Sequence, residues 1–377
     1  MRVGIDVMTA RLQGAGVSRY ARGVLGALAD MDTRDWFMTV SPRLNHNGPL
    51  APLPPFAHGR HIELPISAYH FRRAWLRWGL TVPPDLLAPR LDVFYTPDWP
   101  LLPLAYAKGV CTIHDLAFMI VPEIYNSALL AELTRGVPRM IERARMVITD
   151  VEHTKRDLVR LLNVPSERIR VAGCAADPLF RPISDRAWRA AEQARLGLPD
   201  HFLLSVGTLQ PNKNLVRLVE ALALLRGQGW ALPLFIAGGE GWLYEPMYKR
   251  VADLGLHGLV HFMGRVTDAD LLALYNLTDV MVFPSLYEGF GLPPLEALAC
   301  GVTVVCSNTS SLPEVVGDAA VLVDPYDSDA LAQAIDRAAH DNRLRHDLAE
   351  RSLAQAGRFS WPKVAQTVLS TLREAAS

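Results

Sequence analysis

Short apolar runs alternate with amphipathic stretches along the whole chain, a pattern typical of β-strands that are each followed by a helix. Brief apolar runs of this kind indicate strands that are buried on both faces of a parallel sheet. The first half of the chain contains six predicted strands and three predicted helices. The strands are Val3–Val7, Phe37–Val40, Val93–Tyr95, Val110–Ile113, Met146–Thr149 and Ile169–Val171, and the helices are Val17–Ala29, Ala128–Arg143 and Thr154–Leu162.

The same alternation restarts in the second half and predicts another parallel sheet. Its predicted strands are Phe202–Val206, Leu234–Ala237, Val260–Phe262, Val280–Phe283, Val302–Cys306 and Ala320–Val323. Its predicted helices are Leu215–Arg226, Glu245–Leu254, Asp268–Leu274, Pro293–Ala299 and Asp329–His340.

Two domains follow from this repetition and from a length of 377 residues, which exceeds one ordinary core. The segment Asp177–Asp185 has two prolines and little periodicity, so we predict that it connects the domains. We therefore expect α/β domains over residues 1–178 and 183–358, each a doubly wound parallel sheet, facing a central cleft. The proline-rich stretch over residues 42–65 lacks the pattern and is expected to be irregular.

Composition narrows the class of protein. The net charge of −1 gives no basic field for nucleic acid, and no apolar run approaches the length of a membrane-spanning helix. The N-terminus reads as a first strand and not as a signal peptide, so we expect a cytoplasmic protein. No cysteines form a C-x-x-C pair, which predicts reduced thiols and no structural zinc. They are Cys111, Cys174, Cys300 and Cys306.

Two glutamates, Glu288 and Glu296, are the most informative polar residues, because one lies in a predicted strand-to-helix loop and the other inside the helix. Pro293-Pro294 marks the helix start, and the amides near Gly291 and Leu292 would be donors for an anion. Two carboxylates would repel a phosphate, so they are expected to face the hydroxyls of a ribose or a sugar. The spacing alone is common, and a loop glutamate is usually only solvated.

Other loops after predicted strands carry weaker signals. Gly14 and Gly16 open the first helix, but a plain tight turn explains them equally well. His114 ends a strand and is suited to bind a substrate hydroxyl, with a structural histidine as the even alternative. Lys213 precedes a helix start, where it is suited to neutralise a phosphate, and Asn214 is expected to cap that helix.

Two further loops follow strands of the second half. Gly238 belongs to a loop that brings backbone to the edge of the sheet. After the next strand, Val266 and Asp268 lie where backbone could contact a base, although a helix cap is the preferred reading of Asp268.

With these loops in order, the chain resembles the retaining GT-B glycosyltransferases with an E-x7-E motif, a family that includes bacterial mannosyltransferases and sucrose synthase. The motifs are GAGVSRY, TIHDLAF, SVGTLQPNKNL, IAGGEGWLYE, HFMGRVTDADLLALY, PSLYEGFGLPPLEALACGVTVV and NTSSLPEVVGDAA. The resemblance covers nearly the whole chain and implies a GT-B fold of two Rossmann-like domains. It also implies that a last helix, residues 360–377, packs back on the first domain.

The resemblance assigns roles residue by residue. Glu288 would face the donor sugar, Glu296 would bind ribose hydroxyls, and Lys213 would pair with the donor diphosphate. His114 would lie near the hydroxyls of the donor sugar, which makes Glu288, His114 and Lys213 the catalytic candidates. The remaining donor-binding candidates are Gly16, Thr208, Asn212, Gly238, Val266, Asp268, Gly289, Phe290, Gly291 and Leu292.

The chain departs from the family pattern at three positions. Thr208 stands where many members have an arginine, and Asn212 replaces another basic residue, so Lys213 is expected to carry more of the charge. Ser18 replaces a glycine and is expected to cap the following helix.

The resemblance implies metal-independent transfer with retention, from a nucleoside-diphosphate sugar as cosubstrate and with no other cofactor. GDP-mannose is the favoured donor, and UDP-glucose or UDP-N-acetylglucosamine is the alternative. The acceptor would be a saccharide or a lipid-linked saccharide. Residues 70–80 mix three arginines with aromatic side chains, which would suit peripheral contact with an anionic membrane or an ordinary packed helix. An epimerase or a non-catalytic sugar-nucleotide sensor remains the alternative from another class.

Overall fold

The computed structural model describes the chain except for residues 13–15, 45–49, 68–82, 87–89, 99, 101–102 and 231. It divides into two compact units. Unit 1 comprises Met1–Ile120, Ser127–Ala175 and Ser360–Ser377, and unit 2 comprises Val121–Asn126 and Ala176–Phe359. The chain therefore enters unit 2 first for six residues, enters it again at Ala176, and returns to unit 1 for its final helix.

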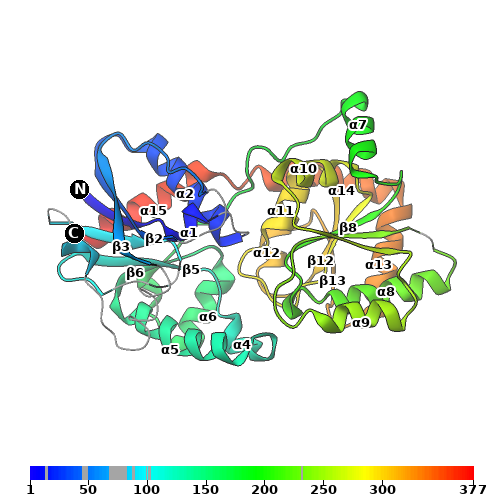
Figure 1. The fold of residues 1–377 in the computed structure, drawn as a ribbon, viewed down its shortest axis with the longest axis horizontal. Helices are drawn as coiled ribbons and strands as arrows, with labels where there is room; N and C mark the ends of the chain where they lie inside the picture. Colours follow the sequence, from blue (N-terminus) through cyan, green and yellow to red (C-terminus); the bar gives the residue numbers. More distant parts are fainter. Residues whose placement is uncertain are drawn as a thin grey trace. The chain divides into compact units, whose positions relative to one another are not determined.

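Unit 1 is built on a seven-stranded parallel sheet in the order β3-β2-β1-β4-β5-β6-β7 (Figure 1). The order reverses direction between β1 and β4, which are neighbours in the sheet although two strands separate them in sequence. The strands are β1 (Arg2–Asp6), β2 (Trp36–Arg43), β3 (Gly59–Ser67), β4 (Val93–Thr96), β5 (Lys108–Ile113), β6 (Ala144–Thr149) and β7 (Ile169–Val171).

Helices surround this sheet, and the last helix of the chain is one of them. Helix α15 packs on α2, where the Trp361 ring lies so close to Gly23 that a Cβ there would be 2.3 Å from it. The helices of unit 1 are α1 (Met8–Arg11), α2 (Gly16–Met31), α4 (Ala117–Ile120), α5 (Ser127–Arg143), α6 (Glu152–Leu162) and α15 (Trp361–Ala376).

Unit 2 contains a six-stranded parallel sheet in the order β10-β9-β8-β11-β12-β13, which reverses between β8 and β11. Its strands are β8 (Leu203–Val206), β9 (Leu234–Ala237), β10 (Val260–Gly264), β11 (Val280–Phe283), β12 (Thr303–Ser307) and β13 (Val321–Val323). Its helices are α7 (Arg186–Leu196), α8 (Leu215–Gly227), α9 (Glu245–Asp253), α10 (Asp268–Leu277), α11 (Leu292–Ala299), α12 (Leu312–Val316), α13 (Ser328–His340) and α14 (Asn342–Ala356).

Successive strand residues of unit 2 enter cores on opposite faces of the sheet. Leu203 packs with residues of α8, α9 and α13, whereas its neighbour Leu204 packs with residues of α10, α11 and α12. Because both faces are covered, the strands are apolar throughout, which is why short apolar runs marked them in the sequence.

All strands predicted from the sequence are present, with shifts at their ends, but the irregular segment predicted over residues 42–65 was wrong in part. Its last residues belong to β3, which continues to Ser67, lies at the edge of the described sheet and pairs with β2. Its residues Gly59, Arg60 and His61 are exposed, so backbone pairing forms this strand without an apolar signal. The prediction also omitted the helices α1, α4, α7, α12 and α14.

Candidate functional site

The reversal of strand order in unit 2 places two predicted site residues together. Ligands in doubly wound sheets bind outside the carboxyl ends of the strands, at the point where the order reverses. Lys213 follows β8 and Glu288 follows β11, and the Lys213 Nζ lies 2.6 Å from the Glu288 Oε1. Their side chains are 13% and 12% exposed, so this ion pair is mostly shielded from water.

Backbone approaches closely around Lys213. Its Nζ lies 4.9 Å from the centroid of the Phe283 ring, and its methylene groups pass beside Gly207, where a Cβ would be 3.1 Å away. A Cβ on Gly238 would come within 1.9 Å of the Gly207 carbonyl oxygen, so only glycine fits there. The packing therefore restricts the side-chain conformation of Lys213 and fixes the place of its ammonium group.

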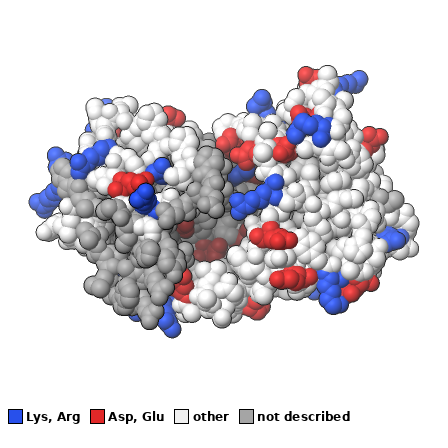
Figure 2. Space-filling model, in the orientation of Figure 1, with Lys and Arg blue, Asp and Glu red and all other residues white. Residues whose placement is uncertain are grey.

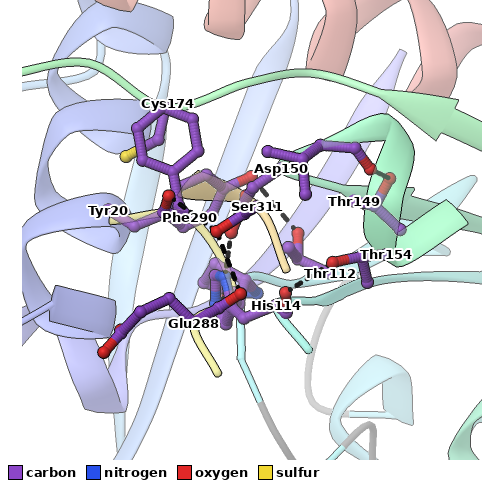
Figure 3. A network of polar contacts seen from close by, with 12 residues as sticks. Tyr20, Thr112, His114, Thr149, Asp150, Thr154, Cys174, Glu288, Phe290 and Ser311 are labelled. Atoms are coloured by element: carbon purple, nitrogen blue, oxygen red, sulfur yellow. Dashed lines mark hydrogen bonds and ion pairs between the residues drawn. The ribbon is translucent and has the colours of Figure 1, made fainter. Parts of the chain in front are cut away.

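The loop that follows β12 forms hydrogen bonds with the segment around Glu288. The Glu288 amide donates to the Ser310 Oγ at 3.0 Å. The Ser311 hydroxyl is within hydrogen-bond distance of the carbonyl oxygens of Glu288 and Phe290, at 2.9 and 2.8 Å. Figure 3 labels these three residues. The Thr309 hydroxyl donates to the Leu286 carbonyl at 3.1 Å. These residues, which follow β12, fix the shape of the glutamate loop.

Helix α11 begins as the sequence indicated. Gly291 precedes it with a φ of 103°, a left-handed conformation that favours glycine, and Pro293 and Pro294 lie in its first turn. Since neither proline has an N–H, the donors at this end are the amides of Gly291 and Leu292. Glu296 is 2% exposed, and its Oε2 accepts a hydrogen bond of 3.1 Å from the Tyr275 hydroxyl.

Two buried oxygen atoms in the lysine and glutamate loops have no hydrogen-bond partner among the residues that the structure describes. They are the Asn212 Oδ1 and the Ser285 Oγ. The Asn212 carbonyl accepts the Leu286 amide at 2.8 Å, which ties the lysine loop to the glutamate loop. Buried polar atoms are normally satisfied, so these two are candidates for contact with a ligand.

His114 lies in unit 1, after β5, and both of its ring nitrogens have partners (Figure 3). The Nδ1 is 2.6 Å from the Asp150 Oδ2, and the Nε2 is 3.0 Å from the Pro97 carbonyl oxygen. Burial lowers the pKa of His114, but the charge of Asp150 and its hydrogen bond, with Asp98 and Asp115, outweigh that effect and raise it to about 9. These carboxylates therefore favour the protonated form of the ring.

The remaining candidates occupy varied positions. Gly16 is the exposed first residue of α2 in unit 1, and Gly289 is half-buried beside Glu288. In unit 2, Thr208 and Val266 are half-buried, while Asp268 is exposed at the start of α10.

Three helix caps predicted from the sequence were wrong. Asn214 has a φ of 53° and makes no cap bond, because its amide donates to the carbonyls of Pro284 and Pro325. Helix α10 is capped by Thr267, whose hydroxyl accepts from the amide of Asp270, and not by Asp268. Ser18 lies inside α2, which already begins at Gly16.

The structure thus brings Asn212, Lys213 and Glu288 together within unit 2, whereas His114 and Gly16 belong to unit 1. The membrane contact expected for residues 70–80 lies entirely outside the described residues. Among the described residues, no three His, Cys, Asp or Glu side chains gather as metal ligands, and no helix is long and apolar enough to span a bilayer. The four cysteines are buried, and none of them forms a disulfide in the structure.

Sequence reasoning missed four residues that support the candidates: Ser310, Ser311, Tyr275 and Asp150. The serines follow β12 and Asp150 follows β6, so each occupies a carboxyl-end loop where a site was expected. Tyr275 gave no signal, because it lies in the apolar face of α10.

The geometry defines a class of protein: two doubly wound α/β units, one of which carries a cation, a carboxylate and a helix start at its switch point. Sucrose-phosphate synthase from Thermosynechococcus elongatus has the same fold, with a TM-score of 0.77 at 22% identity over the full length of both chains. This is the GT-B fold of glycosyltransferases.

Sequence comparison identifies the family. The profile described as "Glycosyl transferases group 1" matches residues 188–355. The O-antigen chain mannosyltransferase B of Escherichia coli is 34% identical over 270 residues, which cover 71% of each chain. The serotype-specific mannosyltransferase WbdA of the same organism is 32% identical over 267 residues, 70% of this chain but only 33% of WbdA. The chain belongs to the group 1 glycosyltransferases.

Proposed function

We propose that this glycosyltransferase moves mannose from GDP-mannose to a saccharide or lipid-linked saccharide acceptor, with retention of the anomeric configuration. The observation that carries the proposal is the Lys213–Glu288 pair at the switch point of unit 2. The resemblance to mannosyltransferases at 34% identity favours the sugar.

A sugar nucleotide needs a cation for its diphosphate and hydrogen-bond acceptors for its hydroxyls, and the two residues supply one each. In the proposed complex the diphosphate takes the place of Glu288 beside the Lys213 ammonium group. The freed Glu288 carboxylate then accepts hydrogen bonds from the donor sugar. The ion pair therefore keeps both groups oriented until the donor arrives.

The rest of the donor follows the same edge of unit 2. The amides of Gly291 and Leu292 add partial positive charge at the diphosphate, together with the backbone of Gly289 and Phe290. Glu296 accepts hydrogen bonds from the ribose, which requires the ribose to compete with Tyr275 for a buried carboxylate. Asn212, Thr208 and Gly238 surround the phosphates, and Val266 and Asp268 lie toward the base.

The leaving nucleoside diphosphate is stabilised by Lys213 and the helix amides, so the proposal requires no metal. His114 and Gly16 act from unit 1, His114 toward the donor sugar and Gly16 toward the phosphates. This division of roles comes from the family resemblance.

A donor screen tests the proposal. We expect purified protein to release GDP from GDP-mannose when a mannose-terminated oligosaccharide is present, and to be stabilised against heat by GDP. Activity with UDP-glucose or UDP-N-acetylglucosamine, and none with GDP-mannose, would contradict the proposed donor but not the proposed transfer of a sugar from a sugar nucleotide. Unchanged turnover after treatment with a chelator is expected, and its loss would contradict metal independence.

The same screen separates the other classes. An epimerase would convert the sugar nucleotide without an acceptor, and a sensor would bind GDP-mannose without releasing GDP. Either result would overturn the transferase proposal.

A further inference from the structure

A carboxylate with no assigned role, that of Asp150, contacts the His114 ring directly. The two atoms are 2.6 Å apart, and the side chains of His114 and Asp150 are 15% and 4% exposed. The His114 backbone is also bound to helix α6, because the Thr154 hydroxyl donates to the His114 carbonyl at 3.1 Å. Strand β6 and helix α6 therefore set where the ring of His114 lies.

The partners of the ring dictate where its protons are. The Pro97 carbonyl oxygen near the Nε2 can only accept, so the Nε2 must carry a proton. An ionised Asp150 can also only accept, so the Nδ1 must carry one too. A neutral ring would require the proton to sit on Asp150 instead.

The surroundings favour the charged ring over that neutral arrangement. The carboxylates of Asp98 and Asp115 act on His114 in addition to Asp150, and all three stabilise a cation. The aromatic ring of Tyr20 lies edge-on to the His114 ring, with centroids 4.8 Å apart. Burial raises the pKa of Tyr20 well above its usual value, so it stays neutral. Burial raises the pKa of Asp150 above its usual value, although the charge of His114 and the hydrogen bond to it lower that pKa in part.

The second carboxylate oxygen of Asp150 adds a penalty that the pairing with His114 must offset. The Oδ1 is buried and has no hydrogen-bond partner among the described residues, an arrangement that costs stability in any protein. An asparagine would keep one oxygen for a protonated Nδ1 but would not supply the negative charge.

We propose that Asp150 is a positioning residue that holds His114 as a doubly protonated imidazolium, so that unit 1 presents a fixed cation and not a proton acceptor. The inference rests on the proposed function, in which His114 acts on the donor. It deepens that function in one respect: because both ring N–H groups donate within unit 1, His114 stabilises negative charge as a cation and does not take the proton of the acceptor hydroxyl.

The test is the titration of His114 by nitrogen-15 NMR of the full chain, with His114→Gln used to assign its signals among the 11 histidines. The wild-type ring is expected to remain doubly protonated until the pH approaches about 9. In Asp150→Asn, its pKa is expected to fall to roughly 6.5 or below. Asp336→Asn is the matched control, because it removes an exposed Asp–His pair in unit 2 without touching His114.

Titration of the wild-type ring near its ordinary pKa, or an unchanged titration in Asp150→Asn, would overturn the inference. The wild-type measurement stands even where the variant fails to fold. Turnover with GDP-mannose separates this result from the proposed function. We expect Asp150→Asn to lose activity as the pH rises past its new pKa and to regain it at lower pH. A lowered pKa with activity unchanged at every pH would uphold the pairing and refute the catalytic role of His114.

Discussion

At the scale of single residues, the candidate site depends on charges that are paired before any ligand is present. Lys213 is bound to Glu288 in unit 2, and His114 is bound to Asp150 in unit 1. Both pairs are mostly buried, so removing one partner leaves the other charged and poorly solvated. Single substitutions at these residues therefore affect stability as well as activity.

Replacing Lys213 by alanine removes the cation that we assign to the diphosphate. We expect affinity for GDP to fall about 10- to 100-fold, the range for the loss of a hydrogen bond to a charged group. Isothermal titration with GDP measures this. Lys249→Ala is the control, because Lys249 forms an ion pair of the same length on exposed α9. Equal affinity in wild type and Lys213→Ala would refute the assignment.

The raised pKa of His114 predicts a pH-dependent stability. Its folded pKa of about 9 lies above the unfolded value of roughly 6.5. The stabilisation is therefore fully present below about pH 6.5 and is lost as the pH rises through about 9. Denaturant unfolding across this window should show wild type losing stability relative to His114→Gln. Parallel curves for the two proteins would mean that His114 is not charged in the folded state.

The polar residues of the site could be predicted in part from the sequence. Lys213 and Glu288 follow strands, and carboxyl ends of neighbouring strands meet at one edge of a sheet. Asn214 shows the limit. Its capping role followed from residue type, but two carbonyls distant in sequence bind its side chain instead. Asp150 was missed for the same reason, since its partner is 36 residues away.

At the scale of elements, two contacts between segments distant in sequence hold the parts that carry the site. One is the packing of α15 on α2, where Trp361 lies against Gly23. The other is the support of the Glu288 loop by the serines after β12. Such contacts were invisible to periodicity, as was edge strand β3, which is formed by backbone pairing. Buried strands and long helices were predicted well because both faces of each sheet are covered.

The contact of α2 with α15 gives a matched pair of glycine substitutions. Gly23→Ala places a Cβ 2.3 Å from the Trp361 ring, so we expect a loss of about 1–3 kcal/mol from overpacking. Gly26→Ala in the same helix meets no atom within 4 Å, and is expected to gain about 0.5–1 kcal/mol from helix propensity. Chemical denaturation measures both. Equal effects of the two substitutions would contradict the packing described for α15.

The support of the Glu288 loop can be tested at Ser311. Its hydroxyl contacts two loop carbonyls, and Ser311→Ala is expected to destabilise the protein by about 1–3 kcal/mol and to weaken GDP binding. Ser352→Ala is the control, because Ser352 is equally buried and bonds the backbone of α14 instead. We expect it to lower stability without changing GDP affinity. Weakened GDP binding in both variants would mean that lower stability, and not the loss of support for the Glu288 loop, reduces the affinity.

At the scale of the whole molecule, the chain consists of two compact α/β units, and segments of the two units alternate along the sequence. Figure 2 shows basic and acidic side chains interspersed on the face drawn, in keeping with the net charge of −1. Recognition therefore depends on a few placed charges and not on a global field. The sequence predicted two sheets and their strands except β3. It did not predict the early excursion of Val121–Asn126 into unit 2, where the Trp242 indole donates to the Ile124 carbonyl at 2.7 Å.

The central claim is that this chain transfers mannose from GDP-mannose with retention, using Lys213 as the cation for the departing diphosphate. NMR analysis of the product formed from GDP-mannose and a mannose-terminated oligosaccharide tests it most directly. The account predicts an α-linked mannose and an equal amount of GDP, with the product lost in Lys213→Ala and kept in Lys249→Ala. A β-linked product, full activity in Lys213→Ala, or no sugar transferred from GDP-mannose would contradict it.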